Sequence, residues 1–234
     1  MSAHAQNDKS ITLIMLPGLD GTGRLFTPLL RELPGWVKPT VISYPVDREL
    51  SYSQLASYVR QSISKNSRVV LLAESFSGPV AIALAAGHKE IAGLILCSTF
   101  SSSPRPFLVM FFSMLPLFSI MGSRLPDRLI RAALLGLDST NELIAEFRSA
   151  VRSVKPSVLS HRFKEIAGVN VSSLLGKIDV PVCMIRGKSD MLVPDGALHA
   201  PEGAELHILE GSHLLLQTRA NESARIISRF LEKL

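Results

Sequence analysis

The sequence is poor in cysteine, and neither cysteine stands where a metal site or a disulfide would need it. Two of the 234 residues are cysteines, Cys97 and Cys183, and each lies in a short apolar run outside any cluster with metal-ligand spacing. We therefore expect two reduced, buried thiols. The first nine residues are polar and show no apolar segment of a signal peptide. A cytoplasmic protein is the resulting expectation.

Charge is also scarce, and what there is leans to one sign. Charged residues make up 19% of the chain and apolar residues 47%, which excludes disorder as the main state and suits one domain. The formal net charge is +5, but no basic tail, zinc-ligand spacing or aromatic RNA-binding motif accompanies it, which argues against nucleic acid as a partner. Much of the positive charge falls mid-chain, at Arg124, Arg128, Arg131, Arg148, Arg152, Lys155, Arg162 and Lys164. A solvated helix face or a docking surface for an acidic carrier protein would each explain it.

One stretch, residues 106–123, carries no charge at all. Eighteen uncharged residues are long enough for a membrane span, but Pro116 and Ser113 interrupt this stretch. Strand-like segments before and after it must also share one soluble domain. We therefore expect an apolar lid or cap over a pocket, and peripheral contact with a lipid surface remains the alternative.

The rest of the chain alternates between strand-like and helix-like patterns. Short apolar runs predict strands at 11–16, 41–44, 68–73, 94–97, 180–186 and 205–209. Helical patterns occupy 24–32, 52–64, 78–86 and 220–231. This alternation predicts the α/β class, with a mostly parallel sheet covered by helices on both faces.

Ser75 stands where a predicted strand meets an alanine-rich helical segment. The usual nucleophile-elbow pattern G-x-S-x-G reads here as Ala73-Glu74-Ser75-Phe76-Ser77, with the glycine delayed to Gly78. A serine hydroxyl needs a base to take its proton and fixed donors to meet the emerging oxyanion. We predict Ser75 as the nucleophile and the amide of Phe76 as one oxyanion donor.

A second oxyanion donor is expected from the loop after the first strand. That loop reads LPGLDGTG, and its glycines let the backbone turn back over the site. Leu19 is the residue whose amide we expect beside that of Phe76. The spacing of the loop matches neither a P-loop nor a complete dinucleotide-binding motif, which argues against a phosphate site.

The base and the acid should follow the last two strands. His213 stands in the loop after the final predicted strand, and Asp190 follows the strand before it. Asp190 would orient the imidazole and stabilise its charged form. Asp195 is a rival that better fits a helix cap. The chain order is then Ser75, Asp190, His213, which differs from the order in chymotrypsin-like and subtilisin-like proteases.

The chain resembles the α/β-hydrolase family over nearly its whole length. Four segments carry the resemblance: the loop LPGLDGTG, the elbow AESFSG, the acid loop RGKSDMLVP and the histidine loop EGSHLLLQ. The resemblance implies a core of residues 1–100 and 178–234 with a helical cap inserted at 101–177, together forming one compact domain. It also implies acyl transfer through an acyl-enzyme on Ser75, with no metal or organic cofactor. Ala73, Ser77 and Pro17 depart from the residues usual in the family.

The cap should carry substrate specificity. Its apolar residues would line an acyl pocket, and those we expect to contact substrate are Phe107, Met110, Phe111, Met114 and Phe118. The basic cap is similar to that of acyl-carrier-protein methyl ester esterases of biotin synthesis, with Arg148 and Arg152 as the matching pair for an acidic acyl carrier protein. The LPGLDGTG loop also resembles that of plastid esterase and acyltransferase proteins.

We therefore expect a serine hydrolase that cleaves esters or thioesters of short- to medium-chain acyl groups. The alternatives are an acyl-carrier-protein methyl ester esterase, an acyltransferase of the same fold, and a non-catalytic ligand-binding member.

Overall fold

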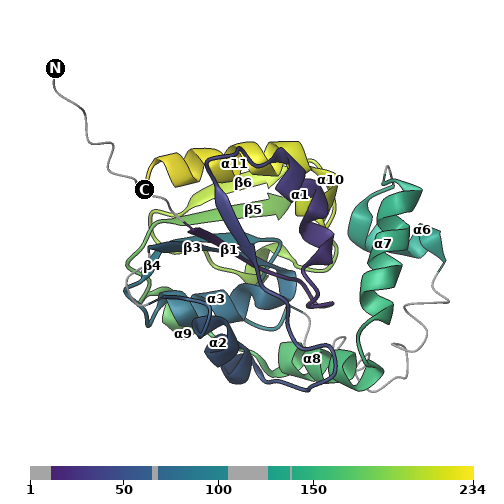
Figure 1. Cartoon of the computed structure of the whole chain (residues 1–234), viewed down its shortest axis with the longest axis horizontal. Coiled ribbons are helices and arrows are strands. Elements are labelled where there is room, and N and C mark those ends of the chain that lie inside the picture. The colour runs from purple at the N-terminus through teal and green to yellow at the C-terminus, as the bar shows by residue number, and fades with distance from the viewer. Residues whose placement is uncertain (1–11, 65–67, 105–125, 138) are drawn as a thin grey trace.

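The computed structural model describes residues 12–64, 68–104, 126–137 and 139–234, and its described strands form one parallel sheet (Figure 1). Six strands lie in the order β2-β1-β3-β4-β5-β6, and every pair of neighbours is parallel. The strands are β1 Thr12–Leu16, β2 Lys38–Val41, β3 Val69–Glu74, β4 Ile91–Cys97, β5 Val182–Gly187 and β6 Glu205–Leu209. The predicted α/β class and parallel sheet are confirmed.

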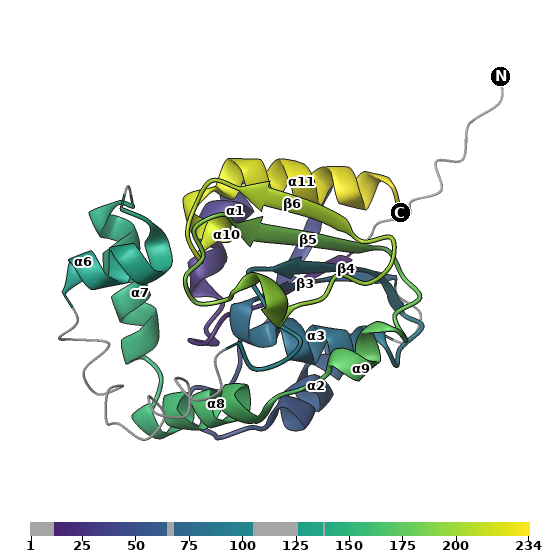
Figure 2. The ribbon, with the colours of Figure 1, turned by 180° about the vertical axis from the view of Figure 1, so that it is seen from behind.

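Helices cover both faces of the sheet. The helices of the first half are α1 Thr27–Glu32, α2 Tyr52–Arg60 and α3 Gly78–Ala85. The described helices between β4 and β5 are α6 Asp127–Ile130, α7 Asn141–Arg152, α8 Pro156–Gly168 and α9 Ser172–Leu175, and those after β6 are α10 Leu215–Thr218 and α11 Ala220–Glu232. Short 3-10 turns are η1 Arg24–Phe26, η2 Ser75–Ser77 and η4 Asp195–Ala197, and η3 Arg131–Leu135 is π-helical. Figures 1 and 2 show α1, α10 and α11 on one face and α2, α3 and α9 on the other.

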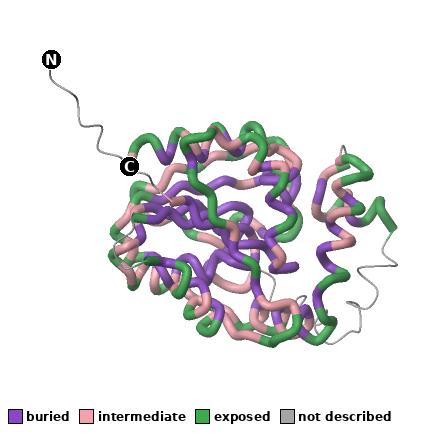
Figure 3. The backbone as a smooth tube through the Cα atoms, in the orientation of Figure 1, coloured by how far each residue is buried: buried purple, intermediate pink, exposed green. Residues whose placement is uncertain are grey.

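The alternation of side chains along each strand builds two separate cores. In β1, Leu13 and Met15 point into the core under α1, α10 and α11, whereas Ile14 and Leu16 point into the core over α2 and α3. Because both faces are buried, the central strands are apolar at nearly every position, which is typical of parallel sheets. Figure 3 shows the buried strands inside a partly exposed helical shell.

A third apolar cluster joins the segment between β4 and β5 to the rest of the chain. Leu25 and Leu214, from the sheet-bearing part, pack with buried residues of α6 to α8. The amide of Leu214 donates to the Leu134 carbonyl at 2.9 Å, and Arg24 pairs with Glu146 at 2.9 Å. Helices α6 and α7 lie beyond the ends of the strands to which the β5 and β6 arrows point (Figure 2). These two helices, which belong to the segment predicted as a cap, therefore face the carboxyl edge of the sheet.

The predicted strand bounds differ most from the structure at β2. The apolar run 41–44 predicts a strand, but β2 ends at Val41, and Ile42 and Tyr44 turn into the core instead. The strand itself includes Pro39, which an edge strand tolerates because it lacks a neighbour on one side. Both cysteines are buried and free, as predicted. Among the described residues, no helix combines the length and apolar character that a bilayer span requires.

Candidate active site

Ser75 lies in a sharp turn between β3 and α3. Its φ is 50°, a left-handed backbone conformation that residues other than glycine rarely adopt. The hydroxyl of Thr99 donates to the Ser75 carbonyl and braces this turn. A Cβ at Gly78 would collide with the same threonine side chain, so glycine is required at this position. Gly78 stands three residues after Ser75, one residue later than the glycine of the usual pattern. The strained turn expected of a nucleophile elbow is present.

Ser77, a departure from the usual glycine, has a structural explanation. Its hydroxyl donates to the carbonyl of Pro17 in the loop after β1, and the Tyr44 hydroxyl bonds with Ser77 Oγ at 2.8 Å. Since the Ser77 proton is used on Pro17, Tyr44 is the donor in the second bond. Burial raises the pKa of Tyr44 above its ordinary range and outweighs the hydrogen bond with Ser77 and the charge of Arg162, so that donor stays protonated. The serine thus ties the elbow to the neighbouring loop.

The three residues predicted as nucleophile, base and acid form one chain of hydrogen bonds. His213 Nε2 lies 2.8 Å from Ser75 Oγ, and His213 Nδ1 lies 2.8 Å from Asp190 Oδ2. The side chains of His213 and Asp190 are only 4% and 1% exposed, so the contact between them is shielded from water. In this geometry an imidazole can take the hydroxyl proton while the carboxylate fixes its tautomer.

The other oxygen of Asp190 is also bonded. Oδ1 accepts from the amides of Leu192 at 2.9 Å and Val193 at 3.1 Å. Burial by itself would raise the pKa of Asp190. The hydrogen bond and charge of His213 and the two amides outweigh burial, and the pKa of Asp190 lies below its ordinary value. The carboxylate is therefore ionised at neutral pH.

The loops that carry Asp190 and His213 are held together by backbone contacts. The amides of Lys188 and Ser189 donate to the carbonyls of Leu209 and Gly211 at 2.9 and 3.0 Å, which extends the pairing of β5 with β6. A Cβ at Gly187 would collide with the backbone of the histidine loop, so glycine permits this approach.

Asp195, the rival acid, takes no part in this arrangement. Its side chain is largely exposed and pairs with Arg186 at 2.8 Å. Asp195 is the first residue of η4, and Pro194 occupies the cap position expected for it.

The loop that carries Leu19 packs directly on the elbow. The amide of Gly21 donates to the Gly18 carbonyl at 3.0 Å and closes a tight turn, a bond that does not use the Leu19 amide. A Cβ built on Gly18 would lie 3.9 Å from Ser75 Cβ, so the turn borders the serine. Phe76 is fully buried in η2 and stacks on Tyr52, with ring centroids 4.9 Å apart. Leu19 thus belongs to a turn that borders Ser75, and Phe76 directly follows Ser75 in the chain.

Glu74, next to the serine, is buried at 2% exposure and does not face outward. Its Oε2 accepts from Gln217 Nε2 at 3.3 Å, whereas Oε1 has no partner among the described residues. Desolvation by burial is the main reason that the pKa of Glu74 rises to about 7; Gln217 and His213 lower it, and Asp20 raises it. In the sequence, only its position next to Ser75 draws attention to Glu74.

The residues predicted to bind substrate and partner all fall between β4 and β5 in the chain. Phe107, Met110, Phe111, Met114 and Phe118 lie outside the described residues. Arg148 donates to Asp127 at 2.6 Å and is mostly buried, whereas Arg152 is exposed on α7.

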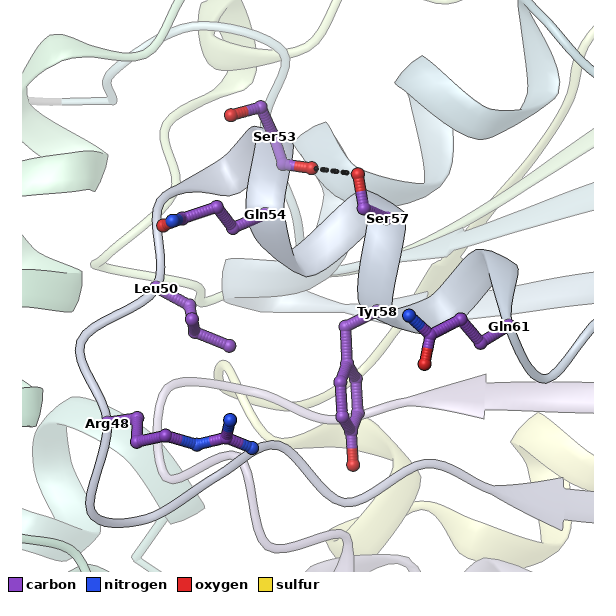
Figure 4. A pocket seen from close by; sticks show the side chains of 7 residues that line it. All are labelled: Arg48, Leu50, Ser53, Gln54, Ser57, Tyr58 and Gln61. Carbon is purple, nitrogen blue, oxygen red and sulfur yellow. Dashed lines mark hydrogen bonds between the residues drawn. The ribbon is translucent and has the colours of Figure 1, made fainter.

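A shallow pocket of about 280 Å³ lies along α2 (Figure 4). Most of the residues that line it have polar side chains; they are Arg48, Leu50, Ser53, Gln54, Ser57, Tyr58 and Gln61. None of these side chains contributes to the hydrogen-bond chain of Ser75, His213 and Asp190.

The protein is similar to known proteins in its three-dimensional structure but not detectably in its sequence. No family model matches the sequence, and no curated protein matches it by sequence. Among solved structures, an enol-lactonase from Burkholderia xenovorans LB400 superposes with a TM-score of 0.80 at 18% identity, covering 99% of this chain and 94% of that one. The chain has the α/β-hydrolase fold.

Two further structures with the α/β-hydrolase fold span nearly the whole chain. MenH from S. aureus has a TM-score of 0.74 at 16% identity, and the superposition covers 100% of this chain and 97% of MenH. An esterase from Exiguobacterium antarcticum has a TM-score of 0.75 at 15% identity, with coverage of 95% and 92%. The predicted α/β-hydrolase fold is confirmed, and at these identities the likeness concerns the fold alone.

Proposed function

We propose that the protein is a serine hydrolase that cleaves carboxylic esters or thioesters through an acyl-enzyme on Ser75. The observation that carries the proposal is the buried hydrogen-bond chain from Ser75 Oγ through His213 to Asp190, with both links at 2.8 Å. Such a chain, set at a strained turn before a helix, fits a base-activated serine nucleophile.

In the proposed mechanism Ser75 Oγ attacks the acyl carbonyl while His213 Nε2 takes its proton. Asp190 stabilises the imidazolium that forms. The amides of Leu19 and Phe76 bind the oxyanion, and the helix behind Phe76 adds a favourable dipole. The imidazolium then protonates the leaving group, and a water activated by His213 releases the acid.

The proposed substrate is an ester or thioester of a short- to medium-chain acyl group. Solved structures of the same fold include proteins described as an enol-lactonase and as esterases, which supports an ester-type bond. The apolar stretch 106–123 supports an acyl chain rather than a polar group as the bound part. Transfer to an alcohol, or an acyl-carrier-protein methyl ester as substrate, would be narrower forms of the same chemistry.

Hydrolysis of p-nitrophenyl esters of increasing acyl length tests the proposal. We expect turnover that peaks at a short or medium chain and falls by at least about three orders of magnitude in Ser75→Ala. Ser153→Ala, an exposed serine on the far end of α7, serves as the matched control and should retain activity. Absence of turnover by the folded wild type across the series would favour a non-catalytic binding protein instead.

A further inference from the structure

The side chain of Arg162, on α8, contacts Leu19 and Phe76 in the candidate site. Arg162 is only 2% exposed, although arginine is rarely buried without a reason. Its Nη1 donates to the Leu19 carbonyl at 2.8 Å, and its Nη2 donates to the Pro45 carbonyl at 3.0 Å. Both hydrogen bonds therefore go to backbone oxygens of loops that follow β1 and β2.

The same guanidinium lies over two aromatic rings. Its Cζ is 5.8 Å from the centre of the Tyr44 ring and 5.9 Å from that of Phe76. Tyr44 in turn bonds to Ser77, which bonds to Pro17. The Arg162 guanidinium thus contacts the ring of Phe76, the residue after Ser75, and also hydrogen-bonds to Leu19 in the loop after β1.

The loop after β1 is shaped to admit this side chain. Gly21 has a φ of 70°, and a Cβ there would collide with the Arg162 guanidinium. The Gly21 carbonyl also accepts from the Tyr44 amide at 2.7 Å, so the loop cannot move away freely. Burial lowers the pKa of Arg162, and the carboxylate of Asp20 is the first of the groups that oppose this. The positive charge of Arg162 is therefore kept in a buried position although its desolvation costs free energy. The loop after β1 is shaped to accommodate it.

We propose that Arg162 is a positioning residue that holds both donors of the oxyanion site, Leu19 and Phe76, in place from the segment between β4 and β5. The hydrogen bond to the Leu19 carbonyl restricts the turn that presents the Leu19 amide. The face contact with the Phe76 ring restricts the residue that presents the second amide. This inference rests on the function proposed above, in which those two amides bind the oxyanion.

Substitution by methionine removes the donors and the charge but keeps a long apolar stem. In Arg162→Met we expect kcat for p-nitrophenyl butyrate to fall by about 10- to 100-fold with KM changed by less than about threefold, because misplaced donors matter only once the oxyanion forms. Arg162→Lys keeps one point charge but cannot donate to both carbonyls in the same fork, so partial rescue is expected. Lys164→Met, an exposed site two residues along α8, is the matched control.

A readout specific to the oxyanion separates this role from general support of the fold. A butyl trifluoromethyl ketone adds to the serine and places a real oxyanion in the site. Its inhibition constant should rise in Arg162→Met by the same factor as kcat/KM falls, with rates expressed per active site after titration with a fluorophosphonate.

The outcomes are distinct. Wild type that neither turns over esters nor reacts with the fluorophosphonate contradicts the proposed function itself. An active wild type whose Arg162→Met and Arg162→Lys variants keep the wild-type kcat and ketone affinity per active site overturns the role of Arg162. A rise in KM without loss of ketone affinity also overturns it. If Arg162→Met does not fold, Arg162→Lys decides by the same two measurements.

Discussion

Replacing Glu74 by glutamine should change how the stability of the protein depends on pH. Glu74 is buried beside the nucleophile, and its pKa is raised from 4.5 to about 7 chiefly by desolvation. A raised carboxyl pKa means that the folded state prefers the neutral acid. The resulting stability is fully present below the unfolded pKa and is lost as the pH rises towards the folded pKa.

The raised pKa sets the size of the effect. A shift from 4.5 to about 7 corresponds to roughly 3 kcal/mol between fully protonated and fully ionised states, of which about 2.5 kcal/mol falls between about pH 5 and pH 8. The uncharged amide of Glu74→Gln cannot ionise, and it keeps a side chain able to pair with Gln217. The free energy of unfolding of the wild type, relative to this variant, should therefore fall by about 2.5 kcal/mol over that range.

Urea unfolding of both proteins at several pH values is the assay. Subtracting the variant cancels the titration of all other groups, provided that their surroundings are unchanged. Glu202→Gln, which replaces an exposed carboxyl, is the control and should leave the pH dependence as in the wild type. A difference between wild type and Glu74→Gln that stays constant to within about 0.5 kcal/mol would refute the reasoning about burial.

Three further predictions concern the site and its surroundings. Asp190→Asn should lower kcat by about three to four orders of magnitude in ester hydrolysis, because an amide leaves the imidazole in the wrong tautomer; loss of less than about tenfold would contradict that role. Gly78→Ala should destabilise the fold by about 1 to 3 kcal/mol in urea unfolding, since its Cβ collides with Thr99, and an unchanged midpoint would contradict the close approach. If an acidic carrier protein docks on the segment between β4 and β5, Arg152→Glu should weaken turnover of carrier-bound esters but not of nitrophenyl esters. Arg148→Glu is a poorer test because it also breaks the ion pair with Asp127.

Much of the site could be predicted because parallel strands bring their carboxyl ends to one edge of a sheet. Ser75, Asp190 and His213 each follow a strand, and this order in the chain is enough to expect them together without any distance. The strand before Tyr44 was placed too late because the apolar run there belongs to a buried loop. An apolar run of four residues does not distinguish those two environments.

The roles of Arg162 and Ser77 could not be predicted in the same way. Arg162 appears in the sequence as one of eight basic residues in the middle of the chain, and its partners lie 143 and 117 residues away. Both partners are backbone carbonyls, which leave no mark in a sequence. One local signal existed: Arg162 lies three residues after Leu159 and four before Ile166, both buried, so it falls on the inner face of α8.

Ser77 was noted as a departure from glycine, but its hydroxyl bonds link three segments that only the fold brings together. Glu74 likewise stood out by its place beside Ser75. Its burial depends on α10 and the loop after β1 closing over it, which no spacing reveals.

The most direct test of the central claim is the site of covalent labelling by a fluorophosphonate, read by intact-mass and peptide mass spectrometry. The proposed mechanism predicts a single adduct on Ser75 in the wild type, none in Ser75→Ala, and labelling slowed by at least about two orders of magnitude in His213→Ala. A folded wild type that stays unlabelled, or a Ser75→Ala variant labelled as readily as the wild type, would contradict the claim that Ser75 is an activated nucleophile.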